Sequence, residues 1–154
     1  MGRVYNRNCS SKDFTIEIKG SEQSMVVAGK RYTFNKLFDT DYKIEHVYPA
    51  KQADMMKLLK GLPEEVEKVY VFGSSLTLHC GAESDIDLLV IADKSEKMYK
   101  AFSRLFKTLD SEVDLIIKTN KEFDENVEVK NSICDVVRRE GLLIYERHLC
   151  TSTN

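Results

Sequence analysis

Hydrophobic and polar residues follow two periods along this chain, one typical of strands and one typical of helices. Short apolar runs predict strands at residues 69–72, 86–92, 112–119 and 142–146. Apolar residues spaced three or four positions apart predict helices at residues 50–61, 97–110 and 129–140. Because strand and helix signals alternate, we expect an α/β fold, with a small mixed β-sheet flanked by helices.

The first part of the chain has a different pattern. Apolar and polar residues alternate at residues 14–18, as in a half-buried strand, and Gly29 lies between two β-rich runs, as in a hairpin. Pro49 then precedes the first predicted helix. The chain is therefore expected to divide into a β-rich N-terminal extension (1–48), one main domain (49–148) and a tail (149–154).

The composition is that of a single soluble domain. The chain has 154 residues, of which 42% are hydrophobic and 31% are charged. No apolar run approaches the roughly 18 residues that a membrane span needs. The first residues also lack the apolar core of a signal peptide, so we expect a cytoplasmic protein without membrane contact.

Charge and cysteine content narrow the possible functions. With a formal net charge of −2, the chain lacks the basic excess that binding to a phosphate backbone requires, which argues against nucleic-acid binding. The four cysteines have neither a C-x-x-C pair nor a histidine at ligand spacing, which predicts reduced thiols rather than a zinc site or disulfides. His79 and Cys80 are expected to fill a surface loop.

Two acids at the start of an apolar strand are the strongest chemical signal. Asp85 and Asp87 are separated by one residue, so their side chains lie on the same face of the strand, about 7 Å apart. Carboxylates this close repel each other unless a cation lies between them. Mg²⁺ is bound by one or two carboxylates together with substrate phosphates. The pair therefore predicts a magnesium site beside a phosphate.

Gly73 and Ser74 follow the strand at residues 69–72 and are the candidate phosphate site. They are predicted to open a short helix, where glycine allows close approach of the backbone and Ser74 adds a hydroxyl donor. A further acid, Asp114, lies within the strand at residues 112–119. If this strand neighbours the strand that carries the acid pair, three carboxylates can hold two metal ions around a phosphoryl group.

A strand, Gly-Ser, an acid-apolar-acid motif and a later lone acid occur in this order in one known family. In these features the chain resembles the DNA polymerase beta-type nucleotidyltransferase superfamily. It is most similar to the small bacterial nucleotidyltransferase domains, because "VVRREGLLIYER" (136–147) is similar to their closing helix and strand. The resemblance covers residues 50–147. It departs after Gly-Ser, where many members have an arginine and this chain has Ser75-Leu76-Thr77-Leu78.

The resemblance implies a polymerase-beta-like fold and a metal-dependent reaction. The implied catalytic and metal-binding residues are Asp85, Asp87 and Asp114, with two Mg²⁺ ions, and the implied nucleotide-binding residues are Gly73, Ser74 and Ser84. The implied reaction moves a nucleoside monophosphate from a nucleoside triphosphate, with ATP expected, to a hydroxyl group. The acceptor is either a small molecule or a partner protein, as in antitoxins that modify a toxin.

Each of these interpretations has an alternative. The whole domain can be a weakly active or inactive antitoxin-like module that binds a partner protein by contact alone, which the missing arginine favours and the three acids oppose. Asp85 and Asp87 can instead cap a turn before a core strand. Asp114 can end a strand or pair with a lysine such as Lys118.

Overall fold

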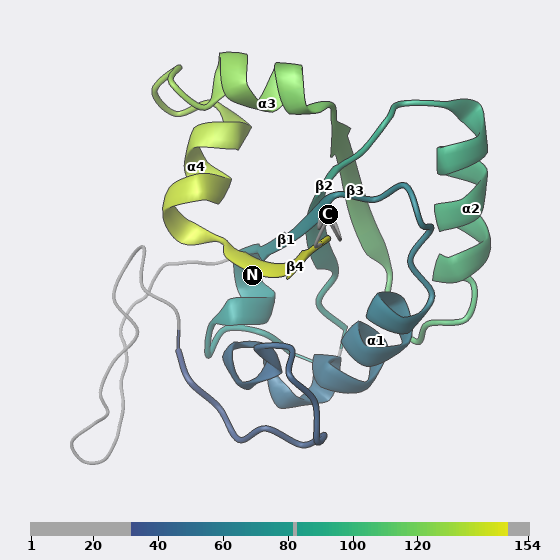
Figure 1. Ribbon diagram of the computed structural model, residues 1–154. Helices are drawn as coiled ribbons and strands as arrows, with labels where there is room; N and C mark the ends of the chain where they lie inside the picture. The colour runs from purple at the N-terminus through teal and green to yellow at the C-terminus, as the bar shows by residue number, and fades with distance from the viewer. Residues whose placement is uncertain (1–31, 82, 148–154) are drawn as a thin grey trace, which may run out of the picture.

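The computed structural model describes residues 32–81 and 83–147, which form one sheet with helices on both faces (Figure 1). In chain order the elements are η2 (Ile44–His46), α1 (Pro49–Lys60), β1 (Lys68–Phe72), η3 (Gly73–Leu76), β2 (Ile86–Ile91), α2 (Glu96–Phe106), β3 (Val113–Lys118), α3 (Asn120–Asn126), α4 (Ile133–Glu140) and β4 (Leu142–Glu146). The expected strand at residues 14–18 and the expected hairpin at Gly29 lie outside the described residues. Residues 32–48, the described part of the expected extension, form the 3-10 turn η2 and no strand.

Strand β2 is at the centre of the sheet. The strand order is β3-β2-β1-β4, with β1 antiparallel to both β2 and β4, and with β2 parallel to β3. Leu88, Leu89 and Val90 of β2 are all fully buried, because a central strand packs on both of its faces. The prediction of a small mixed sheet flanked by helices is confirmed.

Each face of the sheet has its own apolar cluster. Helices α1 and α2 cover the face that presents Ile86, Leu88 and Val90. Helices α3 and α4 cover the opposite face, which presents Leu89 and Ile91. Figure 1 shows these two helix pairs on opposite sides of the sheet. No helix in residues 32–81 and 83–147 is long and apolar enough to cross a membrane.

Side-chain caps determine where the last two helices begin. Thr119 and Glu122 form a capping box at the start of α3, in which each side chain accepts a hydrogen bond from the backbone N–H of the other residue. Ser132 is the N-cap residue of α4, and its side chain accepts a hydrogen bond from the backbone N–H of Asp135. The predicted helix at 129–140 is wrong at its start, because Asn131 has a left-handed backbone (φ 66°) that an α-helix does not tolerate. The helix α3 was not predicted.

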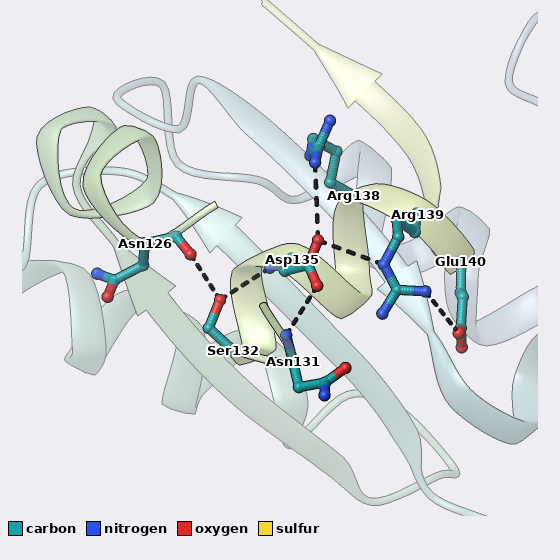
Figure 2. A network of polar contacts seen from close by, with 7 residues as sticks. All are labelled: Asn126, Asn131, Ser132, Asp135, Arg138, Arg139 and Glu140. Atoms are coloured by element: carbon teal, nitrogen blue, oxygen red, sulfur yellow. Dashed lines mark hydrogen bonds and ion pairs between the residues drawn. The ribbon is translucent and has the colours of Figure 1, made fainter. Parts of the chain in front are cut away.

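The turn between α3 and α4 is held by a polar network around Asp135 (Figure 2). The Asp135 carboxylate accepts hydrogen bonds from the backbone N–H of Asn131 (2.9 Å) and from Nε of Arg139 (3.3 Å). The Ser132 hydroxyl accepts from the Asp135 N–H and donates to the Asn126 carbonyl (2.6 Å). The hydrogen bond from Asn131, followed by that from Arg139, holds the pKa of Asp135 below its ordinary value.

Replacing this carboxylate is expected to give a pH-dependent loss of stability. Because the folded state lowers the pKa of Asp135, its contribution is present above about pH 4 and disappears as the pH falls through the folded-state pKa. Asp135→Asn should therefore be less stable than the wild type at pH 7, and the two should converge in strong acid. Urea unfolding at several pH values measures this, with the exposed Glu125→Gln on α3 as the control. A constant difference at all pH values would contradict the assignment.

Candidate active site

The three predicted acids lie at one edge of the sheet, where β1 ends and where β2 and β3 begin. Asp87 is paired with Asp114 in the parallel register of β2 and β3, and with Phe72 in the antiparallel register of β1 and β2. Asp85 directly precedes β2. The sequence left open whether the strand of Asp114 neighbours the strand of Asp87. In the structure these two strands are neighbours.

Register partners on adjacent strands point to the same face, so the side chains of Asp87 and Asp114 lie together. Adjacent strands are about 4.8 Å apart, which is within reach of a shared ligand. Asp85 and Asp114 are exposed and Asp87 is half-buried. Within the described parts of the chain no ion pair holds Asp114, so the alternative pairing with Lys118 is not observed.

Gly73 is the residue on which the geometry around Asp87 depends. Its φ of +79° lies in the left-handed region that glycine adopts without cost. A Cβ atom added at this position would collide with Oδ2 of Asp87. The backbone of the Gly73-Ser74 turn therefore lies directly against the Asp87 carboxylate. Any other residue would displace one of the two.

The predicted short helix after β1 is the 3-10 turn η3. The Ser74 carbonyl accepts hydrogen bonds from the backbone N–H (2.9 Å) and the hydroxyl (3.0 Å) of Thr77, which close this turn. The Ser75 carbonyl accepts from the N–H of Tyr48 (2.7 Å), immediately before α1. The turn is thereby attached to the start of that helix.

Ser84 lies at the other end of the same loop, just before Asp85. Its hydroxyl accepts a hydrogen bond from the N–H of Gly81 (2.9 Å), and its own N–H donates to the Gly81 carbonyl (3.1 Å). These two bonds close a tight turn that leads into β2. Ser74 and Ser84 therefore belong to the two ends of one loop, and β1 and β2 hold those ends side by side.

Cys80, in the middle of this loop, is buried, whereas His79 is exposed. The expectation that both fill a surface loop is therefore wrong for Cys80. Burial raises the pKa of the Cys80 thiol, while hydrogen bonding with Ser84 and the charge of Lys51 partly offset the effect. A thiol with a raised pKa stays protonated at neutral pH and is a poor nucleophile.

Lys51 on α1 is a residue near the site that sequence reasoning missed. Its side chain is among the largest fully buried ones, with 1% of the residue exposed. Its Nζ donates a hydrogen bond to the hydroxyl of Ser111 (2.9 Å), in the turn that leads into β3. A signal existed in the sequence, because Lys51 shares its helical stripe with Met55 and Leu58 at spacings of four and three residues.

The carboxylates at this edge have the donor chemistry that Mg²⁺ prefers. Among residues 32–81 and 83–147, no group of three His, Cys, Asp or Glu side chains is close enough to hold a metal ion by itself. Mg²⁺ usually takes one or two carboxylates and completes its shell with water and substrate phosphates. The pair of Asp87 and Asp114, with a glycine backbone against it, fits this requirement.

Comparisons with known proteins agree with this architecture. The family described as "Polymerase beta, Nucleotidyltransferase" matches residues 54–148, which is more than half of the chain. Comparison with curated proteins gives no match.

Several solved structures are similar to part of this chain. One is a toxin-antitoxin with AMP-PNP (23% identity, 62% of this chain and 73% of that chain covered, TM-score 0.44). A second is a tri-AMPylated Shewanella oneidensis HEPN toxin in complex with MNT antitoxin (21% identity, 64% and 71% covered, TM-score 0.38). A third is the toxin-antitoxin MntA-HepT (22% identity, 64% and 71% covered, TM-score 0.38).

The steric role of Gly73 can be tested without a substrate. Gly73→Ala should lower the free energy of unfolding by about 1–2 kcal/mol, because a side chain at a left-handed position is strained and also meets Asp87. Gly81→Ala is the matched control, since its added Cβ has no neighbour nearer than the Ser84 hydroxyl at 4.0 Å. Its stability should stay within about 0.5 kcal/mol of the wild type. Equal stability of the two variants in thermal unfolding would refute the close packing of Gly73 on Asp87.

Proposed function

Because the chain belongs to the polymerase beta nucleotidyltransferase family, we propose that it transfers a nucleoside monophosphate from a nucleoside triphosphate, with ATP expected, to an acceptor hydroxyl. The observation that carries the proposal is the register of β2 and β3, which puts Asp87 opposite Asp114 beside the Gly73 backbone. Family membership supplies the reaction class, and this edge of the sheet supplies the carboxylates that the reaction needs.

In this proposal Asp85, Asp87 and Asp114 hold Mg²⁺, with two ions expected. When bound, Mg²⁺ lowers the pKa of the acceptor hydroxyl and neutralises negative charge on the leaving pyrophosphate. Asp85 and Asp114 are exposed, so substrate phosphates and water have access to complete the metal shell.

Gly73, Ser74 and Ser84 are proposed to bind the triphosphate. Gly73 has no side chain, which leaves its backbone accessible, and the two serine hydroxyls can donate hydrogen bonds to phosphate oxygens. The acceptor oxygen forms a bond to the α-phosphorus while the bond from this phosphorus to the β-phosphate oxygen breaks. The acceptor proton passes to an aspartate at this edge or to water.

The acceptor that we propose is a hydroxyl group on a partner protein of the toxin class. The four-stranded sheet of the described residues offers few surfaces that could enclose a small molecule. A partner surface would therefore complete a binding cleft. A small-molecule acceptor is the alternative, and the same experiment distinguishes the two.

A second candidate function is partner binding without catalysis. It is favoured by the residues after Gly73-Ser74, where Ser75-Leu76-Thr77-Leu78 provide no positive charge for a triphosphate and Leu78 is 43% exposed. Such a module would neutralise its partner by contact and would need no acid pair.

Labelled ATP separates these possibilities. The purified full chain is incubated with Mg²⁺, cell lysate and ATP labelled at either the α- or the γ-phosphate. Transfer of the α-label alone to one protein supports nucleotidyl transfer to a partner, and transfer to a metabolite supports a small acceptor. Transfer of the γ-label would indicate phosphoryl transfer instead and would refute the proposal. No transfer of either label would favour the binding module.

The acids should be required for transfer but not for folding. Asp87→Asn and Asp114→Asn should each reduce the transfer rate by at least about 100-fold, the loss typical of removing one electrostatic contact to the transition state. The melting temperature of Asp114→Asn should be unchanged or slightly higher, because repulsion between carboxylates is relieved. Asp93→Asn, exposed beyond the opposite end of β2, is the control and should keep full activity. Active Asp87→Asn and Asp114→Asn variants would remove these acids from the mechanism.

A further inference from the structure

Two charged residues of α1 hold the turn that leads into β3. The Asp54 carboxylate accepts hydrogen bonds from the backbone N–H of Asp110 (3.0 Å) and of Ser111 (2.8 Å). Lys51 Nζ donates to the Ser111 hydroxyl (2.9 Å). Lys51 and Asp54 are three residues apart on the helix, so they reach the turn from the same side.

Both charges are buried, which is costly unless hydrogen bonds compensate for the lost water. Lys51 is 1% exposed and Asp54 is 2% exposed. Ser111 accepts from Lys51 through its hydroxyl and donates to Asp54 through its backbone N–H, so one residue links the two charges. Burial raises the pKa of Asp54, but the hydrogen bonds from Asp110 and Ser111 outweigh it and leave the pKa below its ordinary value. Asp54 is thus ionised at neutral pH.

The turn held in this way lies next to the first residues of both acid-bearing strands. Ser111 precedes Asp114 by three residues along the chain. The carbonyl of Glu112, in the same turn, accepts a hydrogen bond from the N–H of Ile86 (2.9 Å), the first residue of β2. The charge of Lys51 also acts on Cys80, in the loop between Ser74 and β2. We call Lys51, Asp54 and Ser111 the α1 clamp. The hydrogen bonds of this clamp therefore lie next to the predicted site.

We propose that the α1 clamp is a positioning device for the metal site, which holds β3 in the register that puts Asp114 opposite Asp87. A slip of one residue would turn Asp114 to the opposite face of the sheet, because side chains alternate along a strand. β3 is an edge strand, paired only with β2 among the described strands, so its register needs support from outside the sheet. This inference rests on the proposed function of the two aspartates as metal ligands.

Stability alone does not require such a device. Apolar residues of similar volume usually stabilise a protein core as well as a buried ion pair does, or better. Buried charges with directional hydrogen bonds instead specify one arrangement of the groups that they contact. The clamp makes its directional contacts to the one turn that decides the position of Asp114.

Coupling between the clamp and Asp114 is the decisive measurement. Mn²⁺ is the probe ion, and its binding to the folded full chain is measured by calorimetry. The proteins compared are the wild type and the single variants Ser111→Ala, Lys51→Met and Asp114→Asn. Two double variants combine each clamp substitution with Asp114→Asn. We expect each clamp substitution to weaken Mn²⁺ binding by about 10–100-fold, as for residues that orient metal ligands. In the Asp114→Asn background the same substitutions should have no further effect, because they act through Asp114.

Lys60→Met, exposed on the same helix, is the matched control and should bind Mn²⁺ like the wild type. Ser111→Ala removes only a hydroxyl, so it keeps the test valid if Lys51→Met fails to fold. Additive losses in the double variants, or wild-type Mn²⁺ affinity in folded Ser111→Ala, would overturn the proposal.

The failure of this inference is distinguishable from the failure of the proposed function. If the wild type transfers label from ATP but the losses are additive, the clamp has no positioning role and the function stands. If the losses are coupled but no label is transferred, the clamp positions a metal site that serves binding rather than transfer.

Discussion

The parallel pairing of β2 with β3 is the interaction on which the candidate site depends. It puts Asp87 and Asp114 in register on one face, although they are far apart in the chain. Parallel strands must be joined by a crossover, and α2 provides it while covering the other face with Phe102. The apolar layer between α2 and the sheet therefore fixes the distance between two carboxylates on the opposite face.

A second constraint comes from β1, which runs antiparallel to β2 and ends beside its start. Phe72 is paired with Asp87, so the next residue, Gly73, must turn away directly over the carboxylate. Only a residue without a side chain fits there at positive φ. Three strand ends, two beginning and one ending, thus converge around the Asp87 carboxylate.

The sequence predicted these components but not their arrangement. The acids, the Gly-Ser pair and the sheet with its flanking helices could be found from residue type and periodicity, which are local properties. The neighbour relation of β2 and β3 could not, because register is set by packing between distant segments. Helix α3 has no apolar stripe, and only its capping box, Thr119 with Glu122, could have indicated it. Lys51 was missed because charged residues are usually exposed, and because its hydrogen-bond partner Ser111 is sixty positions away in the sequence.

The distribution of charge over this edge explains how the acids can be held in place while two of them stay exposed to solvent. Asp85 and Asp114 remain exposed, so they keep their hydration and avoid most of the desolvation penalty. Exposed side chains at the end of a strand have few contacts to fix them. The backbone before Asp114 is held instead by Lys51 and Asp54, which are buried and form directional hydrogen bonds with the turn that leads into β3. In the proposed arrangement the buried charges determine the geometry of this edge, while the exposed charges stay accessible to solvent.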